Sequence, residues 1–276
     1  MRTFVNIDAV SIAASVNEDR FGLKGNLAWM LDGVSPATRS RVAPSGESDA
    51  GWLVDAWDSY LRGVSNDETP LVDLVACGID VVATAAKEQW TAEPEVEPST
   101  TLTLVRHADD RVDYFVLGDS PLVFLMQDGE SVITDDRPDI SNHHLLEKIV
   151  EDARLTGSFA ASREARLVDL AAHRRAHMNN LDGYWVIARD RSASAHALVG
   201  SVPLPRSVLL ASDGFSRAVS TLGLSPSYDA LLSSHSSLLN VAKEIRRAEK
   251  ADPLCTRYPR WSVHDDCSAL HVAPVI

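Results

Sequence analysis

The first ninety residues begin with short apolar runs, and longer segments follow in which apolar residues recur with the period of a helix. Residues 3–14 and 27–31 are short, apolar and rich in β-prone side chains, and a polar turn, Lys24-Gly25-Asn26, lies between them. These features predict two strands. Apolar residues then recur every three or four positions over 48–63 and over 69–90, which predicts two helices.

The remainder of the chain repeats this order of strands and helices. Further strands are predicted over 100–107, 112–118, 121–127, 130–134, 184–188, 207–212 and 267–272. Further helices are predicted over 142–156, 162–178 and 226–250. Helices that fall between blocks of hairpin strands favour an α+β fold, with antiparallel sheets and helices packed outside them. We expect a single domain over residues 1–276.

Composition narrows the possible partners. The chain has 276 residues, 45% of them hydrophobic, and a formal net charge of −13. The acidic balance argues against general nucleic-acid binding and against an anionic membrane surface. Cys77, Cys255 and Cys267 are scattered, as expected for free thiols in a reducing compartment. With no apolar signal region or run of about 20 apolar residues, we expect a cytoplasmic protein.

Four aspartates mark the ends of apolar strands. Asp32, Asp119 and Asp213 each follow such a run, and Asp265 precedes the last one. A lone buried carboxylate is costly, and several together repel one another unless a cation neutralises them. Oxygen ligands suit Mg²⁺ or Mn²⁺. Together with the Asn17-Glu18-Asp19 motif, these acids predict one divalent-metal site.

The competing interpretation is that each Asp-Gly pair is only a turn. Asp128-Gly129 and Asp182-Gly183 are assigned as such ordinary turns. The ordered set of motifs, rather than any single one, favours the metal site.

This ordered set resembles that of the PP2C-type metal-dependent Ser/Thr protein phosphatases, in particular their compact bacterial branch. The resemblance rests on Asn17-Glu18-Asp19, Asp32-Gly33, Gly118-Asp119-Ser120, Ser212-Asp213-Gly214 and Asp265-Asp266-Cys267-Ser268, and runs from about residue 6 to residue 272. It implies a four-layer α-β-β-α sandwich of two antiparallel sheets flanked by helices. It also implies a centre of two Mn²⁺ or Mg²⁺ ions, with a third, weaker site.

The resemblance further implies a role for each acid. Asp32 would bridge the two ions, and Glu18 with the Gly33 carbonyl would complete one site. Asp213 and Asp265 would complete the other, and Asp19 would hold coordinated water. Asp32, Asp213 and Asp19 are thus the candidate catalytic residues. Asp119 would contribute to the third site.

The reaction implied is hydrolysis of phosphoserine or phosphothreonine in proteins. A water between the two ions would attack phosphorus in line, without a covalent nucleophile from the protein. A phosphorylated protein is the implied substrate, and a cognate Ser/Thr kinase a possible partner.

The chain departs from the family pattern where the substrate would bind. Many members have an Arg five residues before the Asp of the first motif, and here that position is Ala14. Arg20, Arg39 and Arg41 are candidate substitutes. Val34 replaces the His of eukaryotic members, and Pro121 replaces an Arg after the third motif.

Two alternatives therefore stay open: a PP2C-fold binding or regulatory module with little catalysis, and a phosphatase of small metabolites. Outside the acidic motifs, His173 and His177 are predicted to be exposed helix residues, and His264 a plain turn residue.

Overall fold

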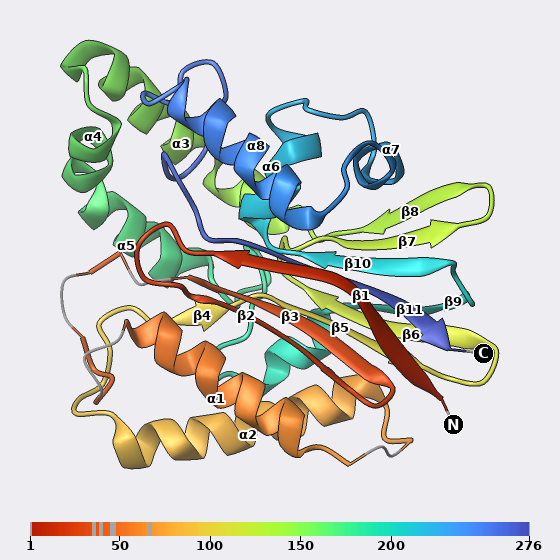
Figure 1. Cartoon of the computed structure of the whole chain (residues 1–276). Helices are drawn as coiled ribbons and strands as arrows, with labels where there is room; N and C mark the ends of the chain where they lie inside the picture. Colours follow the sequence, from red (N-terminus) through yellow and green to blue (C-terminus); the bar gives the residue numbers. More distant parts are fainter. Residues whose placement is uncertain (1, 35–36, 39–40, 45–47, 66–67, 276) are drawn as a thin grey trace.

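Two antiparallel sheets pack face to face in the computed structural model, which describes residues 2–34, 37–38, 41–44, 48–65 and 68–275 (Figure 1). One sheet contains, in spatial order, β1 (Thr3–Ile12), β11 (Cys267–Val275), β10 (Ser207–Ala211), β7 (Leu122–Met126) and β8 (Gly129–Ile133). The other contains β2 (Asp19–Lys24), β3 (Leu27–Val34), β5 (Leu102–His107), β6 (Arg111–Leu117) and β9 (Leu198–Pro203), with β4 (Ser99–Thr100) paired to β3.

Helices cover the outer face of each sheet (Figure 1). The helices are α1 (Asp49–Gly63), α2 (Leu71–Gln89), α3 (Arg137–Thr156), α4 (Phe159–Ala165), α5 (Leu167–His177), α6 (Asp213–Ser220), α7 (Tyr228–Ser234) and α8 (Leu238–Lys250), with a 3₁₀ helix at Arg191–His196. Trp57 of α1 packs on the sheet that contains β3, and Ile245 of α8 packs on the sheet that contains β10. The predicted α+β fold, a four-layer sandwich of two antiparallel sheets flanked by helices, is confirmed.

Strand β3 is buried on both faces. Trp29 and Leu31 pack against the α1 and α2 layer, whereas Ala28 and Met30 pack between the two sheets. Successive side chains of a strand point to opposite faces, so this continuous apolar run fills two layers at once. The end of β3, where Asp32 lies, is therefore fixed from both sides.

The last strand of the chain lies inside its sheet. β11 pairs with β1 on one side, from Thr3 opposite Val275 to Ile12 opposite Cys267, and with β10 on the other. The two ends of the chain consequently lie close together (Figure 1).

Several predicted elements are wrong. Residues 184–188 form no strand and make only isolated bridges, because Trp185 and Ile187 are buried against the α1 and α2 layer without joining a ladder. The predicted helix 226–250 is split into α7 and α8, since the Ser237 side chain accepts from the amide of Asn240 and starts a new helix. The predicted helix 162–178 is likewise divided into α4 and α5.

Four short elements were not predicted: β2, β9, α6 and the 3₁₀ helix at Arg191–His196. β9 is an edge strand with partly exposed, weakly apolar side chains, so it lacks the usual strand pattern. Asp128-Gly129 does form the β7–β8 hairpin turn, and Asp182-Gly183 lies in a turn, as predicted.

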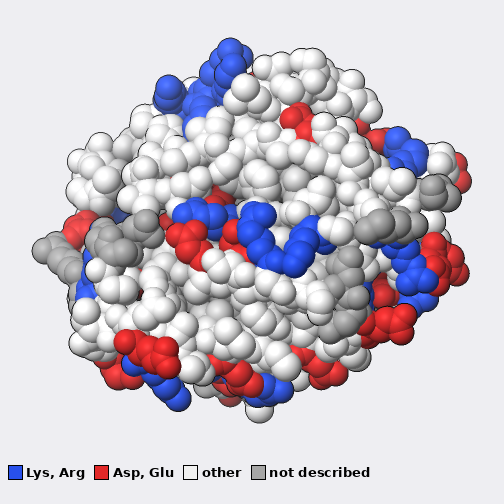
Figure 2. All heavy atoms as spheres, turned by 60° about the horizontal axis from the view of Figure 1, so that its bottom comes forward, with Lys and Arg blue, Asp and Glu red and all other residues white. Residues whose placement is uncertain are grey.

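Charged side chains of both signs share the face shown in Figure 2. Several Lys and Arg side chains gather near its centre beside Asp and Glu, and others are scattered toward the rim. The net negative charge is therefore not spread as a uniform acidic layer on this face. Across the described ranges, no helix combines the length and apolar character needed to cross a membrane.

Candidate metal centre

Asp19 and Asp32 lie opposite each other in the β2–β3 hairpin. They are partners in the antiparallel register, which continues to Lys24 and Leu27 at the turn. Residues directly opposite on neighbouring strands have side chains on the same face, and a like-charged pair there is destabilising. The hairpin thus brings two carboxylates together at a cost that a bound cation would offset.

The sheet that contains β10 and β11 brings Asp213 and Asp265 close to Asp19 and Asp32. Asp213 is the first residue of α6, directly after β10, and its amide donates a 3.0 Å hydrogen bond to Oδ2 of Asp32. Asp265 comes just before β11, the neighbour of β10. The ends of strands from both sheets therefore meet, although Asp32 and Asp213 are 181 residues apart in sequence.

All six residues predicted to hold metal line one cavity of about 210 Å³. They are Glu18, Asp32, Gly33, Asp119, Asp213 and Asp265. Asp19 is not among the lining residues and is buried, with 3% of its surface exposed. A second cavity of about 520 Å³ shares Asp119 and Asp213 with the first, so the acidic cavity adjoins a larger hollow.

Burial and mutual repulsion raise the pKa values of the clustered acids. Burial, followed by the charges of Asp19 and Asp213, holds the pKa of Asp32 well above its usual range. Burial and then Asp265 raise the pKa of Asp213 to about 7. The pKa of Asp119 is also well raised, by burial and then by Asp139. These carboxylates therefore lie in surroundings that favour neutralisation, by protons or by a metal ion.

One buried oxygen of the cluster has no hydrogen-bond partner. It is Oδ2 of Asp19. Burial, with the charge of Asp266 adding to it, keeps the pKa of Asp19 well above its usual range. A buried acceptor without a partner is costly. Carboxylate oxygens, one of them without a partner, form a donor set that suits Mg²⁺ or Mn²⁺.

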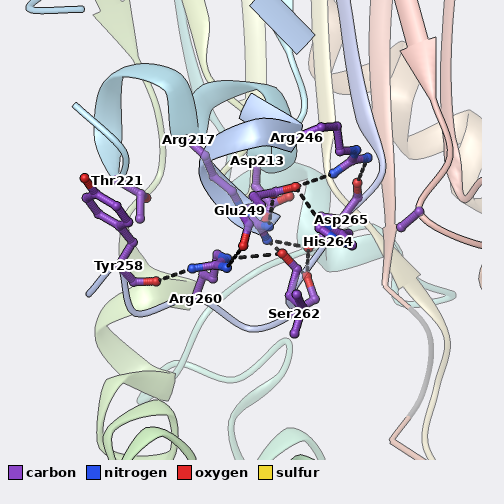
Figure 3. A network of polar contacts seen from close by, with 12 residues as sticks. Asp213, Arg217, Thr221, Arg246, Glu249, Tyr258, Arg260, Ser262, His264 and Asp265 are labelled. Carbon is purple, nitrogen blue, oxygen red and sulfur yellow. Dashed lines mark hydrogen bonds and ion pairs between the residues drawn. The ribbon is translucent and has the colours of Figure 1, made fainter. Parts of the chain in front are cut away.

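Asp265 is held by Arg217, one helical turn after Asp213 on α6 (Figure 3). Nη2 of Arg217 lies 2.5 Å from Oδ2 of Asp265, which also accepts a 2.7 Å hydrogen bond from Ser262. Burial raises the pKa of Asp265, but Arg217 and Ser262 outweigh it, and the pKa is lowered overall. Asp265 thus stays ionised more readily than Asp32, Asp119 or Asp213, whose pKa values are raised.

Glu249 anchors this arrangement from α8. It is fully buried, and its carboxylate contacts Arg217 at 3.0 Å, Arg246 at 2.7 Å and Nδ1 of His264 at 3.0 Å (Figure 3). His264 is therefore a partner of Glu249 rather than the plain turn residue predicted from the sequence. Arg217 and Glu249 were not singled out from the sequence, although the position of Arg217 four residues after Asp213 offered a signal.

Asp266 and Gly33 position the backbone around Glu18. The Asp266 carboxylate accepts hydrogen bonds from the amides of Glu18 at 2.5 Å and Ala14 at 2.8 Å. The amide of Gly33 donates to the Glu18 carbonyl at 3.0 Å, and a Cβ at Gly33 would lie 2.7 Å from that oxygen. Only glycine fits this close approach of the two chain segments.

The acids converge, but they are not arranged as a ready ligand set. In the described part of the chain, no three His, Cys, Asp or Glu side chains form a group that could hold a metal ion. Oδ2 of Asp265 contacts Arg217, and Oδ2 of Asp32 accepts from the Asp213 amide. A metal ion bound by this set would therefore compete with these contacts or share the carboxylates with them.

Of the arginines singled out from the sequence, the two that the structure describes do not line the acidic cavity. Arg20 pairs with Asp55 at 2.6 Å, and Arg41 is exposed. Arg39 lies outside the described residues, as does the neighbouring segment 35–36. Two arginines that the sequence analysis missed, Arg163 of α4 and Arg174 of α5, line the acidic cavity.

His173 and His177 are half-buried rather than exposed, so that prediction is wrong. Their rings stack with centroids 4.0 Å apart, and the ring of His144 from α3 meets His173 edge-on at 5.3 Å. Packing of α5 against α3 covers the helix face on which they lie.

Comparison with known proteins identifies the family of this chain. The protein phosphatase 2C family model matches residues 11–251, and the chain belongs to this family. A search of curated proteins finds no match.

Solved structures with similar folds include bacterial phosphatases. The catalytic domain of the serine/threonine phosphatase PstP in complex with two manganese ions is 19% identical, with a TM-score of 0.56 and 100% of each chain covered. PppA of Pseudomonas aeruginosa, a regulatory component of the T6SS, is 16% identical, with a TM-score of 0.56 over 99% of this chain and 98% of PppA. Stp1 of Staphylococcus aureus is 16% identical, with a TM-score of 0.53 over 99% of this chain and 95% of Stp1. At these identities the likeness establishes the shared fold.

Proposed function

We propose that the protein is a Mg²⁺- or Mn²⁺-dependent phosphatase that hydrolyses phosphoserine and phosphothreonine in proteins. The observation that carries the proposal is the convergence of five carboxylates on one cavity in a protein phosphatase 2C family member: Glu18, Asp32, Asp119, Asp213 and Asp265. The larger hollow beside this cavity supports a substrate bigger than a phosphate ion.

We assign the metal-holding roles as the family pattern suggests. Asp32 would contact both ions, and Glu18 with the Gly33 carbonyl would hold one. Asp213 and Asp265 would hold the other, with Asp119 near a third. When bound, the ions would supply positive charge for the phosphoryl oxygens and lower the pKa of an attacking water.

The remaining residues of the centre would keep these ligands in place. Asp266 fixes the Glu18 backbone through the amide of Glu18. Arg217 and Ser262 orient Asp265, and Arg217 is itself held by the buried Glu249. Asp19, buried behind the lining, offers an unpartnered oxygen for coordinated water.

The direct test is turnover of p-nitrophenyl phosphate and of a phosphothreonine peptide with Mn²⁺, then with EDTA. Asp32→Asn and Asp213→Asn should each reduce the rate by at least about 10²-fold, as for removal of a major electrostatic group. Asp128→Asn, in the β7–β8 turn, is the matched control and should retain the wild-type rate. Near-normal rates in both site variants would refute the assignment.

The same assays separate the alternatives. A small-metabolite phosphatase would hydrolyse p-nitrophenyl phosphate and leave phosphopeptides untouched. A binding or regulatory module would bind Mn²⁺ by calorimetry and turn over neither substrate. The contact between Arg217 and Asp265 is the observation that favours this second alternative, because an internal cation already occupies part of the acidic cluster.

We further propose that residues 1–276 form one phosphatase domain in the cytoplasm, with a cognate Ser/Thr kinase as the source of its substrates. We propose no nucleic-acid or membrane partner. Limited proteolysis tests the domain assignment: a stable fragment much shorter than the chain would contradict it.

A further inference from the structure

The wall of the acidic cavity opposite the strand ends is built by helices. Pro138 and Asn142 of α3, Arg163 of α4 and Arg174 of α5 all line it. In Figure 1 these helices lie together at one end of the sandwich. The cavity therefore has carboxylates on the side of the sheets and two guanidinium groups on the helical side.

Apolar packing and one ion pair fix the helical wall. Ile149 of α3, Phe159 of α4 and Leu170 of α5 share one buried cluster. Arg166, at the junction of α4 and α5, reaches back to Asp152 of α3 at 2.7 Å. The positions of Arg163 and Arg174 are thus set by the packing of the whole helical segment.

Arg163 and Arg174 are not simply solvated surface charges, because each is partly withdrawn from water. The Nε atom of Arg163 is buried and has no hydrogen-bond partner. Burial lowers the pKa of Arg174, Tyr184 opposes this, and the nearby Arg163 lowers the pKa further. Two cations are held close together facing a cavity, and one buried donor is unused.

Neutralisation of the acidic side chains by the two arginines accounts for part of this arrangement. Glu18 attracts Arg174, so this arginine does offset some of the negative charge of the cavity. That role leaves the buried Nε of Arg163 without a hydrogen-bond partner, and the two guanidinium groups still repel each other. An anion with several oxygens, placed between the helical wall and the acidic cluster, would satisfy both.

We propose that Arg163 and Arg174 form the phosphate-binding pair of this protein, in place of the arginine that is absent at Ala14. Guanidinium groups bind phosphate oxygens in a bidentate, charge-assisted manner, which a hydrated lysine ammonium reproduces only in part. A phosphate monoester would lie with some oxygens toward the arginines and the others toward the acidic cluster. The ligand class is a phosphate monoester dianion, and this assignment deepens the proposed function and rests on it.

The test compares Arg163→Ala, Arg174→Ala, Arg163→Lys and Arg174→Lys with two control variants. Arg175→Ala is the control on α5, since Arg175 is exposed and pairs with Glu95 at 3.2 Å. Arg154→Ala is the control on α3, where Arg154 pairs with Glu151 at 3.0 Å on the surface. Affinity for inorganic phosphate is measured by calorimetry with and without Mn²⁺, and KM and kcat are measured for p-nitrophenyl phosphate.

We expect each alanine variant to lose at least about 10-fold in phosphate affinity and to show a similar rise in KM, the scale of a lost hydrogen bond to a charged group. The lysine variants should fall in between, and both controls should match the wild type. If Arg174→Ala does not fold, Arg174→Lys and Arg163→Ala still decide the outcome.

Two results would overturn the proposal. One is unchanged phosphate affinity and KM in the Arg163 and Arg174 variants, with catalysis intact, which leaves the proposed function standing. The other is a wild-type protein that binds no phosphate under either condition. Phosphate binding that depends on both arginines without any turnover would support the binding pair and count against the phosphatase assignment.

Discussion

The guanidinium group of Arg217 lies 2.5 Å from the Asp265 carboxylate, so a candidate metal ligand is already paired with a cation supplied by the protein. The two residues are 48 positions apart in sequence and belong to α6 and to the segment before β11. A divalent ion that binds Asp265 must compete with this contact or share the carboxylate with it.

Removal of Arg217 should destabilise the fold strongly. Arg217→Met leaves the fully buried Glu249 without one of its cationic partners, and breaking a buried ion pair typically costs about 3–5 kcal/mol. The free energy of unfolding from urea titration measures this loss. The double variant Arg217→Met with Glu249→Met should recover part of the stability, whereas Arg154→Ala, at an exposed pair, should change little. Equal effects of the buried and the exposed substitution would contradict the structural role of Arg217.

Mn²⁺ should raise the thermal stability of the protein in a concentration-dependent way. A ligand that binds only the folded state adds about 2.7 kcal/mol at a concentration 100 times its dissociation constant. Because Asp32 and Asp213 would supply ligands, Asp32→Asn or Asp213→Asn should reduce the shift of Tm, and EDTA should abolish it. Asp128→Asn should show the wild-type shift. A Tm that is insensitive to Mn²⁺ in the wild type would argue against a metal centre, independently of any activity.

Gly33→Ala should damage the centre through the backbone. The new Cβ would lie 2.7 Å from the Glu18 carbonyl oxygen, so β3 and the Glu18 segment must move apart. Overpacking of this kind costs about 1–3 kcal/mol, and we expect weaker Mn²⁺ binding by calorimetry as well. Gly63→Ala, at the last position of α1 with open space around it, is the matched control and should leave both measurements near wild type. Normal Mn²⁺ affinity in Gly33→Ala would remove the assigned role of this glycine.

The packed histidines should make the protein sensitive to acid. Burial, with the charges of His177, His144 and Arg174 acting in the same direction, lowers the pKa of His173 from 6.5 to about 4. A histidine whose pKa is depressed in the folded state contributes stability above its unfolded pKa, and this contribution is lost as the pH falls from about 6.5 to about 4.

His173→Gln should therefore flatten the decline in unfolding free energy between pH 6.5 and 4. His235→Gln is an informative comparison, because Glu244 raises the pKa of His235 and the sign of its contribution is reversed. An identical pH profile for wild type and His173→Gln would rule out His173 as the titrating group.

The metal candidates could be found from sequence because each is tied to a local pattern. Asp32, Asp119 and Asp213 follow apolar strands, and strand ends in a sandwich meet at the edge of the sheets. The contacts that hold these acids could not be found in this way. Arg217 and Glu249 meet only after α6 and α8 have packed together, and no local pattern marks that pair.

The errors in the predicted secondary structure also arise from contacts between segments that are far apart in sequence. The buried run around Trp185 has the composition of a strand, yet packing rather than strand pairing buries it. The edge strand β9 owes its structure to pairing with β6, from Arg111 opposite Pro203 to Val116 opposite Leu198, and not to its own weak apolar pattern. Arg163 and Arg174 could not be found from sequence for a similar reason, because they reach the cavity only through the packing of α3, α4 and α5.

The position of β11 has a consequence for biosynthesis. Asp265, Asp266 and this strand leave the ribosome after Glu18, β1 and β10, which they contact. A nascent chain that ends before residue 265 lacks both an interior strand of one sheet and the carboxylate that fixes the Glu18 backbone. The acidic centre can therefore assemble only after Asp265, Asp266 and β11 have been synthesised, and a product terminated before them should carry no partial activity.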